Sequence, residues 1–219
     1  MAELVTGLRA ERVRSNLEAV RAEIATAAAT AGRAAEDVEL LVAVKYVALE
    51  EVGVLAEAGV TVVGENRAQE LERKAAAHPE LTWDFIGQLQ SRKVKVVAPL
   101  VRRIHSVASE SALKELGKHA PPGLEVLVEV NVAGEEGKAG VAPAELGAFV
   151  ERCPADVVGL MVMPPLAERP EDSRRWFAAA RELAAEHGLT RLSMGTTQDF
   201  AVAVEEGATI VRVGSRLFR

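Results

Sequence analysis

The chain has little cysteine, few aromatic residues, no excess of basic residues and no long apolar run. Its 219 residues include one cysteine, Cys153, which excludes an internal disulfide and a cysteine-based zinc site and fits a reducing compartment. Aromatic residues make up 4%, and 26 basic residues stand against 32 acidic ones, so the net charge is −6. Stacking platforms for bases and binders of phosphate backbones have the opposite balance. We therefore expect no nucleic-acid partner.

The apolar runs are interrupted by charge well before the ~20 residues that a membrane span requires. Near the N-terminus, Glu3, Arg9 and Glu11 stand where a signal peptide would have its apolar core. We therefore expect a cytoplasmic protein without membrane contact. Its 49% apolar and 26% charged residues are typical of an ordinary globular fold.

The first 32 residues predict a helix, because apolar residues recur at helical spacing from Leu4 and Leu8 to Ile24. Gly32 suits its C-terminal cap. Downstream, short runs rich in Val, Ile and Leu alternate with helical stretches. The predicted strands are 39–44, 60–63, 82–86, 101–106, 124–131, 156–161, 190–194 and 208–213. The predicted helices are 49–58, 66–77, 91–97, 109–119, 143–151, 171–187 and 198–206, with Gly59, Gly188 and Gly207 at helix ends.

Eight strands alternating with helices predict an α/β fold with a parallel sheet, closed into a (β/α)₈ TIM barrel. We expect a single domain over 1–219, in which the helix over 1–32 is an addition before the first strand. An open doubly wound sheet is the alternative, but Lys45-Tyr46-Val47 follows the first strand where that fold has a glycine-rich fingerprint. Roughly 23 residues remain for each βα unit, below the usual allowance, so short loops are expected.

Polar residues gather after the predicted strands, where this fold carries its chemistry. Lys45 ends an apolar strand, and a lysine that loses solvation in a barrel mouth supplies the neutral amine needed for a Schiff base. An edge lysine that reaches water is the alternative interpretation. Glu65 and His105 are candidate general acids or bases and equally candidate structural residues. No HxH, HExxH or acidic cluster indicates a metal site.

The last two strand ends form a candidate phosphate site. Gly195-Thr196-Thr197 and Gly214-Ser215 lie where this fold commonly holds phosphate with backbone N–H groups. Thr197 and Ser215 add hydroxyl donors, although both types also serve as plain turn and cap residues. Arg212 lies inside the last strand, where an unpaired charge is costly, and therefore needs an acidic partner or an acceptor on a ligand.

These residues carry a resemblance to a known family. Along nearly its whole length the chain resembles the pyridoxal 5′-phosphate (PLP) homeostasis proteins. The matching motifs are Lys45-Tyr46-Val47, GENRAQE (64–70), WDFIGQLQSRKV (83–94), IHSVAS (104–109), VNVAGEEGKAGV (130–141), GLMVMPP (159–165), LSMGTTQDF (192–200) and EEGATIVRVGSRLF (205–218). The resemblance implies a barrel of PLP fold type III, like the N-terminal domain of alanine racemase but without its C-terminal β domain, with PLP as cofactor.

Residue by residue, the resemblance implies that Lys45 forms the Schiff base and that Arg212 faces the pyridine nitrogen. Val44 departs from the family pattern, which commonly has Ser or Thr there, and Gln88 replaces a frequent histidine. Neither change removes a cofactor anchor, but Val44 bears on how Lys45 is oriented. The implied cofactor contacts are Lys45, Asn66, Met163, Ser193, Thr197, Arg212, Gly214 and Ser215.

The resemblance further implies a monomer that binds, buffers and delivers PLP, with apo forms of PLP-dependent enzymes as partners. A donor-only arginine at the ring nitrogen makes PLP a weak electron sink, so we expect little catalysis. A PLP-dependent amino-acid racemase is the alternative, although the only tyrosine, Tyr46, directly follows Lys45 and is poorly placed for the opposite face of a substrate. A cofactor-free lyase or isomerase using Lys45 on a phosphosugar is the third hypothesis.

Overall fold

The centre of the molecule is a closed barrel of eight parallel strands. The computed structural model describes residues 4–219, in which the strands pair in chain order and β8 closes on β1. Each strand overlaps its predicted segment, so the predicted (β/α)₈ barrel is confirmed. The strands are β1 (Glu39–Ala43), β2 (Val62–Glu65), β3 (Thr82–Phe85), β4 (Arg103–Val107), β5 (Glu125–Glu129), β6 (Asp156–Met161), β7 (Arg191–Thr196) and β8 (Ile210–Val213).

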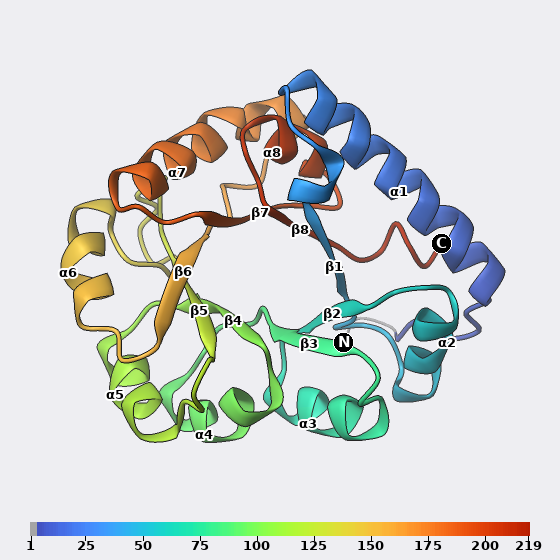
Figure 1. Cartoon of the computed structure of the whole chain (residues 1–219), viewed down its shortest axis with the longest axis horizontal. Helices are drawn as coiled ribbons and strands as arrows, with labels where there is room; N and C mark the ends of the chain where they lie inside the picture. Colours follow the sequence, from blue (N-terminus) through green and yellow to red (C-terminus); the bar gives the residue numbers. More distant parts are fainter. Residues whose placement is uncertain (1–3) are drawn as a thin grey trace.

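Helices connect the strands and surround them as a ring (Figure 1). Gly59, Gly188 and Gly207 follow three of these helices with φ of +91°, +66° and +100°, as expected for helix ends. None of the helices in residues 4–219 combines the length and apolar character needed to cross a bilayer. The connecting helices are α2 (Val52–Glu57), α3 (Ala68–Ala77), α4 (Val94–Val97), α5 (Glu110–His119), α6 (Leu146–Glu151), α7 (Arg174–Glu186) and α8 (Phe200–Glu205).

The leading helix, α1 (Ala10–Thr30), completes this ring. It packs against α8 on one side and α2 on the other (Figure 1). The side-chain amide of Asn16 donates to the backbone carbonyls of Leu217 at 3.1 Å and Arg219 at 2.9 Å. The helix predicted as an addition therefore takes the place of a helix after β8, and it fastens the C-terminal segment to the barrel.

The helix begins later than the predicted range of 1–32. Val5 forms a bridge with Val47, and Gly7 has a φ of +70°, which interrupts a helical path. The Glu51 carboxylate accepts the backbone N–H groups of Gly7 at 2.6 Å and Leu8 at 3.0 Å. These tertiary bonds hold residues 4–9 outside the helix, so the prediction that Leu4 and Leu8 belong to its apolar face is wrong. Residues 1–3 of the predicted helix lie outside the described residues.

Alternating side chains of the strands fill the barrel interior. Part of the interior is apolar, with Leu41, Leu127, Met161 and Ile210 from four different strands in contact. Because side chains repeat with a period of two, residues two or four positions further along the same strands face the barrel mouth. Lys45 follows Leu41 in this way, and Arg212 follows Ile210. The strand pattern thus aims the candidate site residues into one opening.

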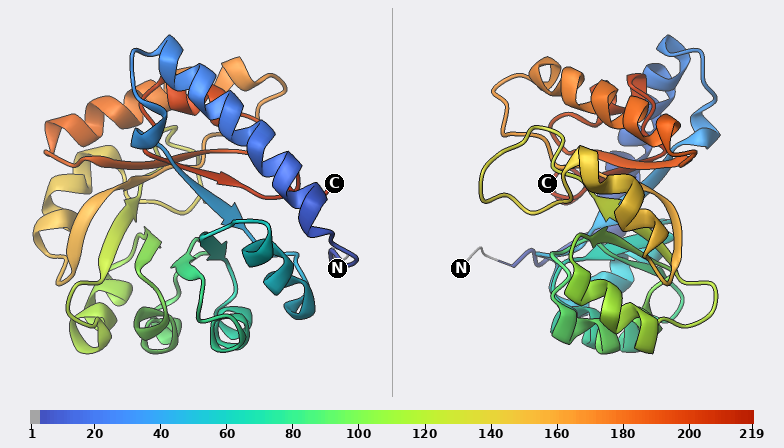
Figure 2. Two further views of the ribbon diagram at one scale, coloured as in Figure 1. Left: turned by 45° about the vertical axis from the view of Figure 1, so that its right-hand side comes forward. Right: turned by 90° about the vertical axis from the view of Figure 1, so that its left-hand side faces the viewer.

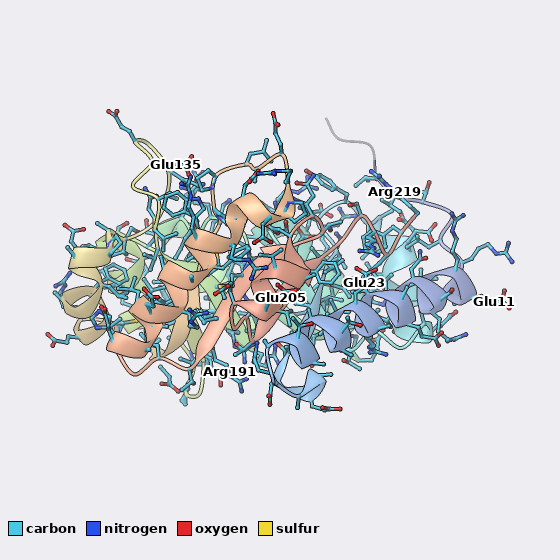
Figure 3. The ribbon with its side chains drawn as sticks, turned by 90° about the horizontal axis from the view of Figure 1, so that it is seen from above. Glu11, Glu23, Glu135, Arg191, Glu205 and Arg219 are labelled. Carbon is cyan, nitrogen blue, oxygen red and sulfur yellow. The ribbon has the colours of Figure 1, made fainter. Side chains whose placement is uncertain are left out.

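The carboxyl ends of the strands define the mouth. Figure 3 shows Glu135 and Arg219, which follow β5 and β8, at this end, and Arg191, the first residue of β7, at the opposite end. The segment 130–142 after β5 is longer than the short loops predicted, and it projects beyond the barrel (Figure 2). The Asn131 side chain braces it by donating to the Glu135 carbonyl at 2.8 Å and accepting the Glu135 N–H at 3.1 Å.

Candidate functional site

A cavity of about 600 Å³ opens at the barrel mouth, within the usual size range of small-molecule sites. Every predicted cofactor contact lines this cavity except Ser193, which is fully buried. The sequence prediction missed Ala43 and Ile86, although Ala43 shares the strand face of Lys45. The residues lining the cavity are Val5, Ala43, Lys45, Tyr46, Asn66, Ile86, Met163, Thr196, Thr197, Gln198, Arg212, Gly214, Ser215, Phe218 and Arg219.

Lys45 lies half-buried in the turn after β1, and its backbone is fixed from outside the cavity. Its carbonyl accepts a hydrogen bond from the Arg67 guanidinium at 2.8 Å. Its Nζ lies 5.0 Å from the ring centroid of Tyr46, a cation–π distance. Tyr46 therefore stands on the same side of the cavity as the amine. The Lys45 side chain itself forms no hydrogen bond within residues 4–219, which leaves its amine available to a ligand.

A buried ion pair braces this end of the barrel. Lys74 on α3 donates to the Glu65 carboxylate at 2.7 Å and to the Val44 carbonyl at 2.9 Å, and both charged side chains are essentially inaccessible. The other Glu65 oxygen accepts the backbone N–H groups of Asn66 at 2.7 Å and Arg67 at 3.1 Å. The candidate acid or base Glu65 thus ties the end of β1 to the end of β2 and does not line the cavity.

Asn66 carries a buried oxygen that lacks a partner. Its Oδ1 is the one side-chain polar atom among residues 4–219 that is buried without a hydrogen bond. The Asn66 backbone rests on Gly87, where an added Cβ would lie 2.1 Å from the Asn66 carbonyl oxygen. Only glycine allows this approach. Because a buried polar atom without a partner is costly, Asn66 is suited to a polar group of a ligand.

The loops after β7 and β8 meet at the other side of the cavity. The Thr197 hydroxyl accepts the Gly214 N–H at 3.2 Å. Asp199 shapes the first loop by accepting the backbone N–H of Thr196 at 2.7 Å and its hydroxyl at 3.1 Å. Gly195 has a φ of +86°, and an added Cβ would lie 2.5 Å from Ala203 on α8. The two predicted phosphate loops are therefore adjacent.

Arg212 is 6% exposed and gives four of its five N–H groups to the protein. Nη1 donates to the Ser193 carbonyl and hydroxyl, both at 2.6 Å. Nη2 donates to the Val162 carbonyl at 3.1 Å and to the Met163 sulfur at 2.9 Å. Burial lowers the pKa of Arg212 to about 10, against the raising effect of Asp199 and Glu129, so the side chain stays charged at neutral pH. The remaining donor, Nε–H, has no hydrogen-bond partner among residues 4–219.

Polar residues continue from Arg212 into the barrel. His105 Nδ1 lies 2.8 Å from the Ser193 hydroxyl and His105 Nε2 lies 3.1 Å from Asp84 Oδ2, all fully buried. At the base, Arg102 binds Asp84 and Glu39 through two hydrogen bonds each, at 2.8–3.1 Å. The candidate acid or base His105 is thus away from the cavity wall. We call Asp84, His105, Ser193 and Arg212 the interior relay.

The two departures from the family pattern lie outside the cavity lining. Val44 is fully buried in the outer core, while its carbonyl is the group that Lys74 binds. Gln88 is exposed. Within residues 4–219, no three side chains of His, Cys, Asp or Glu gather as metal ligands.

Known proteins share this architecture. Residues 15–219 match the family model of the alanine racemase N-terminal domain. A pyridoxal phosphate homeostasis protein of Aquifex aeolicus is 42% identical over 217 residues, which cover 92% of this chain and 95% of that protein. A solved structure of an unknown protein from Bifidobacterium adolescentis has a TM-score of 0.86 and 32% identity, covering 99% of this chain and 98% of its own. PipY of Synechococcus elongatus, solved with PLP bound, has a TM-score of 0.80 and 31% identity, covering 94% and 100%.

Proposed function

Because the chain belongs to the family of pyridoxal phosphate homeostasis proteins, whose fold is that of the alanine racemase N-terminal domain, we propose that it binds PLP at the barrel mouth and serves in PLP homeostasis. The observation that carries the proposal is one cavity that joins a lysine amine, a buried arginine donor and two adjacent hydroxyl-bearing loops. PipY, a relative of 31% identity, was solved with PLP bound.

The residues present fit this cofactor. When bound, PLP supplies an aldehyde that condenses with a lysine amine, a pyridine nitrogen and a phosphate. Lys45 is the lysine amine that lines the cavity. Arg212 keeps one N–H for an acceptor such as the pyridine nitrogen, and Asn66 holds a buried oxygen that still lacks a partner. Met163, whose sulfur accepts a hydrogen bond from Arg212, lines the same cavity and would pack beside the ring.

We assign the phosphate to the loops after β7 and β8. Thr197 and Ser215 supply hydroxyl groups, and Gly214 allows the backbone to approach closely. The Gly214 N–H now donates to the Thr197 hydroxyl and so links the two loops. A bound phosphate would replace this hydroxyl as the acceptor of the Gly214 N–H. Ser193 contributes through Arg212 instead of touching the cavity.

The same geometry favours holding PLP over racemisation. Arg212 only donates, so it requires the ring nitrogen to remain unprotonated, and the cofactor is then a weak electron sink. Racemisation also needs acid and base groups on opposite faces of the substrate. Tyr46 lies beside the Lys45 amine, so these two groups share one face. An amino-acid racemase is therefore the weaker candidate.

Absorbance spectroscopy tests the proposal directly. Purified protein titrated with PLP should develop a visible band, and borohydride reduction followed by mass mapping should place the modification on Lys45. Lys45→Ala should abolish the band, while the exposed Lys118→Ala, placed on α5 far from the mouth, should retain it. A wild-type protein that takes up no PLP would refute the proposal. Lys45-dependent interconversion of D- and L-alanine or serine in a chiral assay would favour the racemase.

Delivery of PLP, a cytoplasmic location and a monomeric state complete the proposal. A protein that buffers PLP must release it to apo forms of PLP-dependent enzymes. Transfer should appear as recovered activity of an added apoenzyme when the PLP-loaded protein is the only source of cofactor. Light scattering after gel filtration tests the monomer, and fractionation of cells tests the location.

A further inference from the structure

The interior relay connects the cavity to a histidine that the proposed function has not used. His105 is fully buried and 88 positions from its partner Ser193, so its place is a tertiary feature of the barrel. Its two ring nitrogens meet the Ser193 hydroxyl and Asp84, and both contacts are within hydrogen-bond distance. Ser193 in turn binds Arg212 through its hydroxyl and its carbonyl.

The direction of each hydrogen bond follows from the chemistry of the groups. Arg212 is donor-only, so the Ser193 oxygen accepts from Nη1 and its own hydrogen is free to point elsewhere. His105 Nδ1, at 2.8 Å, is the acceptor in line for that hydrogen. A histidine that accepts at Nδ1 carries its proton on Nε2, which then donates to Asp84. The chain of donors therefore runs from Arg212 through Ser193 and His105 to Asp84.

We propose that His105 is a positioning residue of the cofactor site, which acts as a neutral imidazole protonated on Nε2. By accepting from Ser193 at Nδ1, it turns the Ser193 oxygen toward Arg212 and keeps Nη1 bound to the protein, while Val162 and Met163 bind Nη2. The Nε–H of Arg212 is then the single donor presented to the ligand. This inference rests on the proposed function, because the ligand that receives this donor is the pyridine nitrogen of PLP.

An imidazolium at this position would break the arrangement. A proton on Nδ1 would require the Ser193 oxygen to accept from His105 as well as from Arg212, and the Ser193 hydrogen would lose its acceptor in the relay. Asp84 cannot rotate to compensate, because Arg102 holds both of its oxygens at 2.8 and 3.1 Å. The relay thus fixes one protonation state of His105.

Nitrogen-15 NMR of the PLP-free protein tests the relay itself. At neutral pH we expect a pyridine-type shift for Nδ1 of His105 and a pyrrole-type shift for Nε2, assigned by comparison with His105→Asn. The opposite tautomer or an imidazolium would overturn the inference. This measurement needs no cofactor, so its outcome is separate from that of the proposed function.

Two substitutions then test the effect on the cofactor. His105→Asn keeps an acceptor where Nδ1 stands, whereas His105→Leu removes it. We expect His105→Leu to release PLP at least about tenfold faster than the wild type and to shift the visible absorbance, and we expect His105→Asn to restore most of both. Leu116→Ala, a buried α5 residue outside the relay, controls for lost stability.

A His105→Leu protein with wild-type release and absorbance would overturn the inference, as would the same changes in Leu116→Ala. A wild-type protein that binds no PLP would refute the proposed function and with it the cofactor part of the inference. The NMR result would still decide the tautomer of His105 in that case.

Discussion

The buried state of His105 should make the free energy of unfolding depend on pH in a defined window. Burial lowers the pKa of His105, Asp84 opposes this, and the charges of Arg212 and Arg103 lower it further. The unfolded chain therefore binds a proton near the ordinary value of about 6.5, while the folded protein binds it only at lower pH. The contribution of the neutral His105 to the free energy of unfolding is therefore complete above about pH 6.5 and is lost as the pH falls below this value.

The magnitude follows from one proton. An imidazole whose pKa is lowered in the folded protein costs at most about 1.9 kcal/mol of stability between about pH 7 and pH 5, for an unfolded pKa near 6.5. Although burial raises the pKa of Asp84, hydrogen bonds from His105 and Arg102 hold it below its usual value, so Asp84 remains a carboxylate in this window. Wild type should lose up to about 1.9 kcal/mol more than His105→Asn over the same range.

Urea unfolding of the PLP-free proteins measures this difference. Wild type and His105→Asn are compared at both pH values, with circular dichroism and tryptophan fluorescence followed together to establish two-state behaviour. The other titrating groups are common to the two proteins and cancel in the difference, except Asp84, which loses the His105 contact but keeps both hydrogen bonds from Arg102 in His105→Asn. Equal pH dependence in both proteins would refute the reasoning, because it would mean that folding does not shift the His105 proton equilibrium.

Two further predictions concern the ends of the barrel. Thr197→Ala combined with Ser215→Ala should weaken PLP binding by about 1–3 kcal/mol, the usual value of hydrogen bonds to a charged group, but should leave the binding of pyridoxal unchanged. If pyridoxal binds the wild type as tightly as PLP does, the phosphate assignment is contradicted. Lys74→Met should lower the free energy of unfolding by about 3–5 kcal/mol, because it leaves the Glu65 carboxylate buried without its cation. The double variant Lys74→Met with Glu65→Gln should recover part of this loss, and an equal loss in the single and double variants would contradict the pairing.

The sequence predicts the barrel well because each strand and helix carries its own local signal. Apolar runs, helical spacing and glycines after helices are read from neighbouring residues, and they located all eight strands. The start of α1 was predicted too early because its true limit is tertiary: the Glu51 carboxylate, 43 and 44 positions away, takes the backbone N–H groups of Leu8 and Gly7. No local pattern contains that bond.

The candidate site divides in the same way. Residues at strand ends, such as Lys45 and Thr197, are predictable because parallel strands in a barrel end at one mouth. Strand periodicity also predicts that His105 faces the barrel interior, but it does not predict that Ser193 is its neighbour there. Lys74 has the sequence context of an ordinary helix lysine, and only the packed structure shows that it is buried against Glu65. Contacts between distant strands therefore had to come from the structure.

The barrel interior contains an apolar cluster and a polar network. Well-packed hydrophobic residues commonly match or exceed the stability of buried charged groups. What the polar network provides is orientation. Arg102 holds Asp84 and Glu39 at the base, Asp84 fixes the His105 ring, and Ser193 passes that constraint to Arg212 at the mouth. An arginine held only by apolar neighbours would keep several N–H groups free to turn toward a ligand. Ser193 of the interior relay, together with Val162 and Met163, instead commits four of them to the protein, so one donor remains for the ligand.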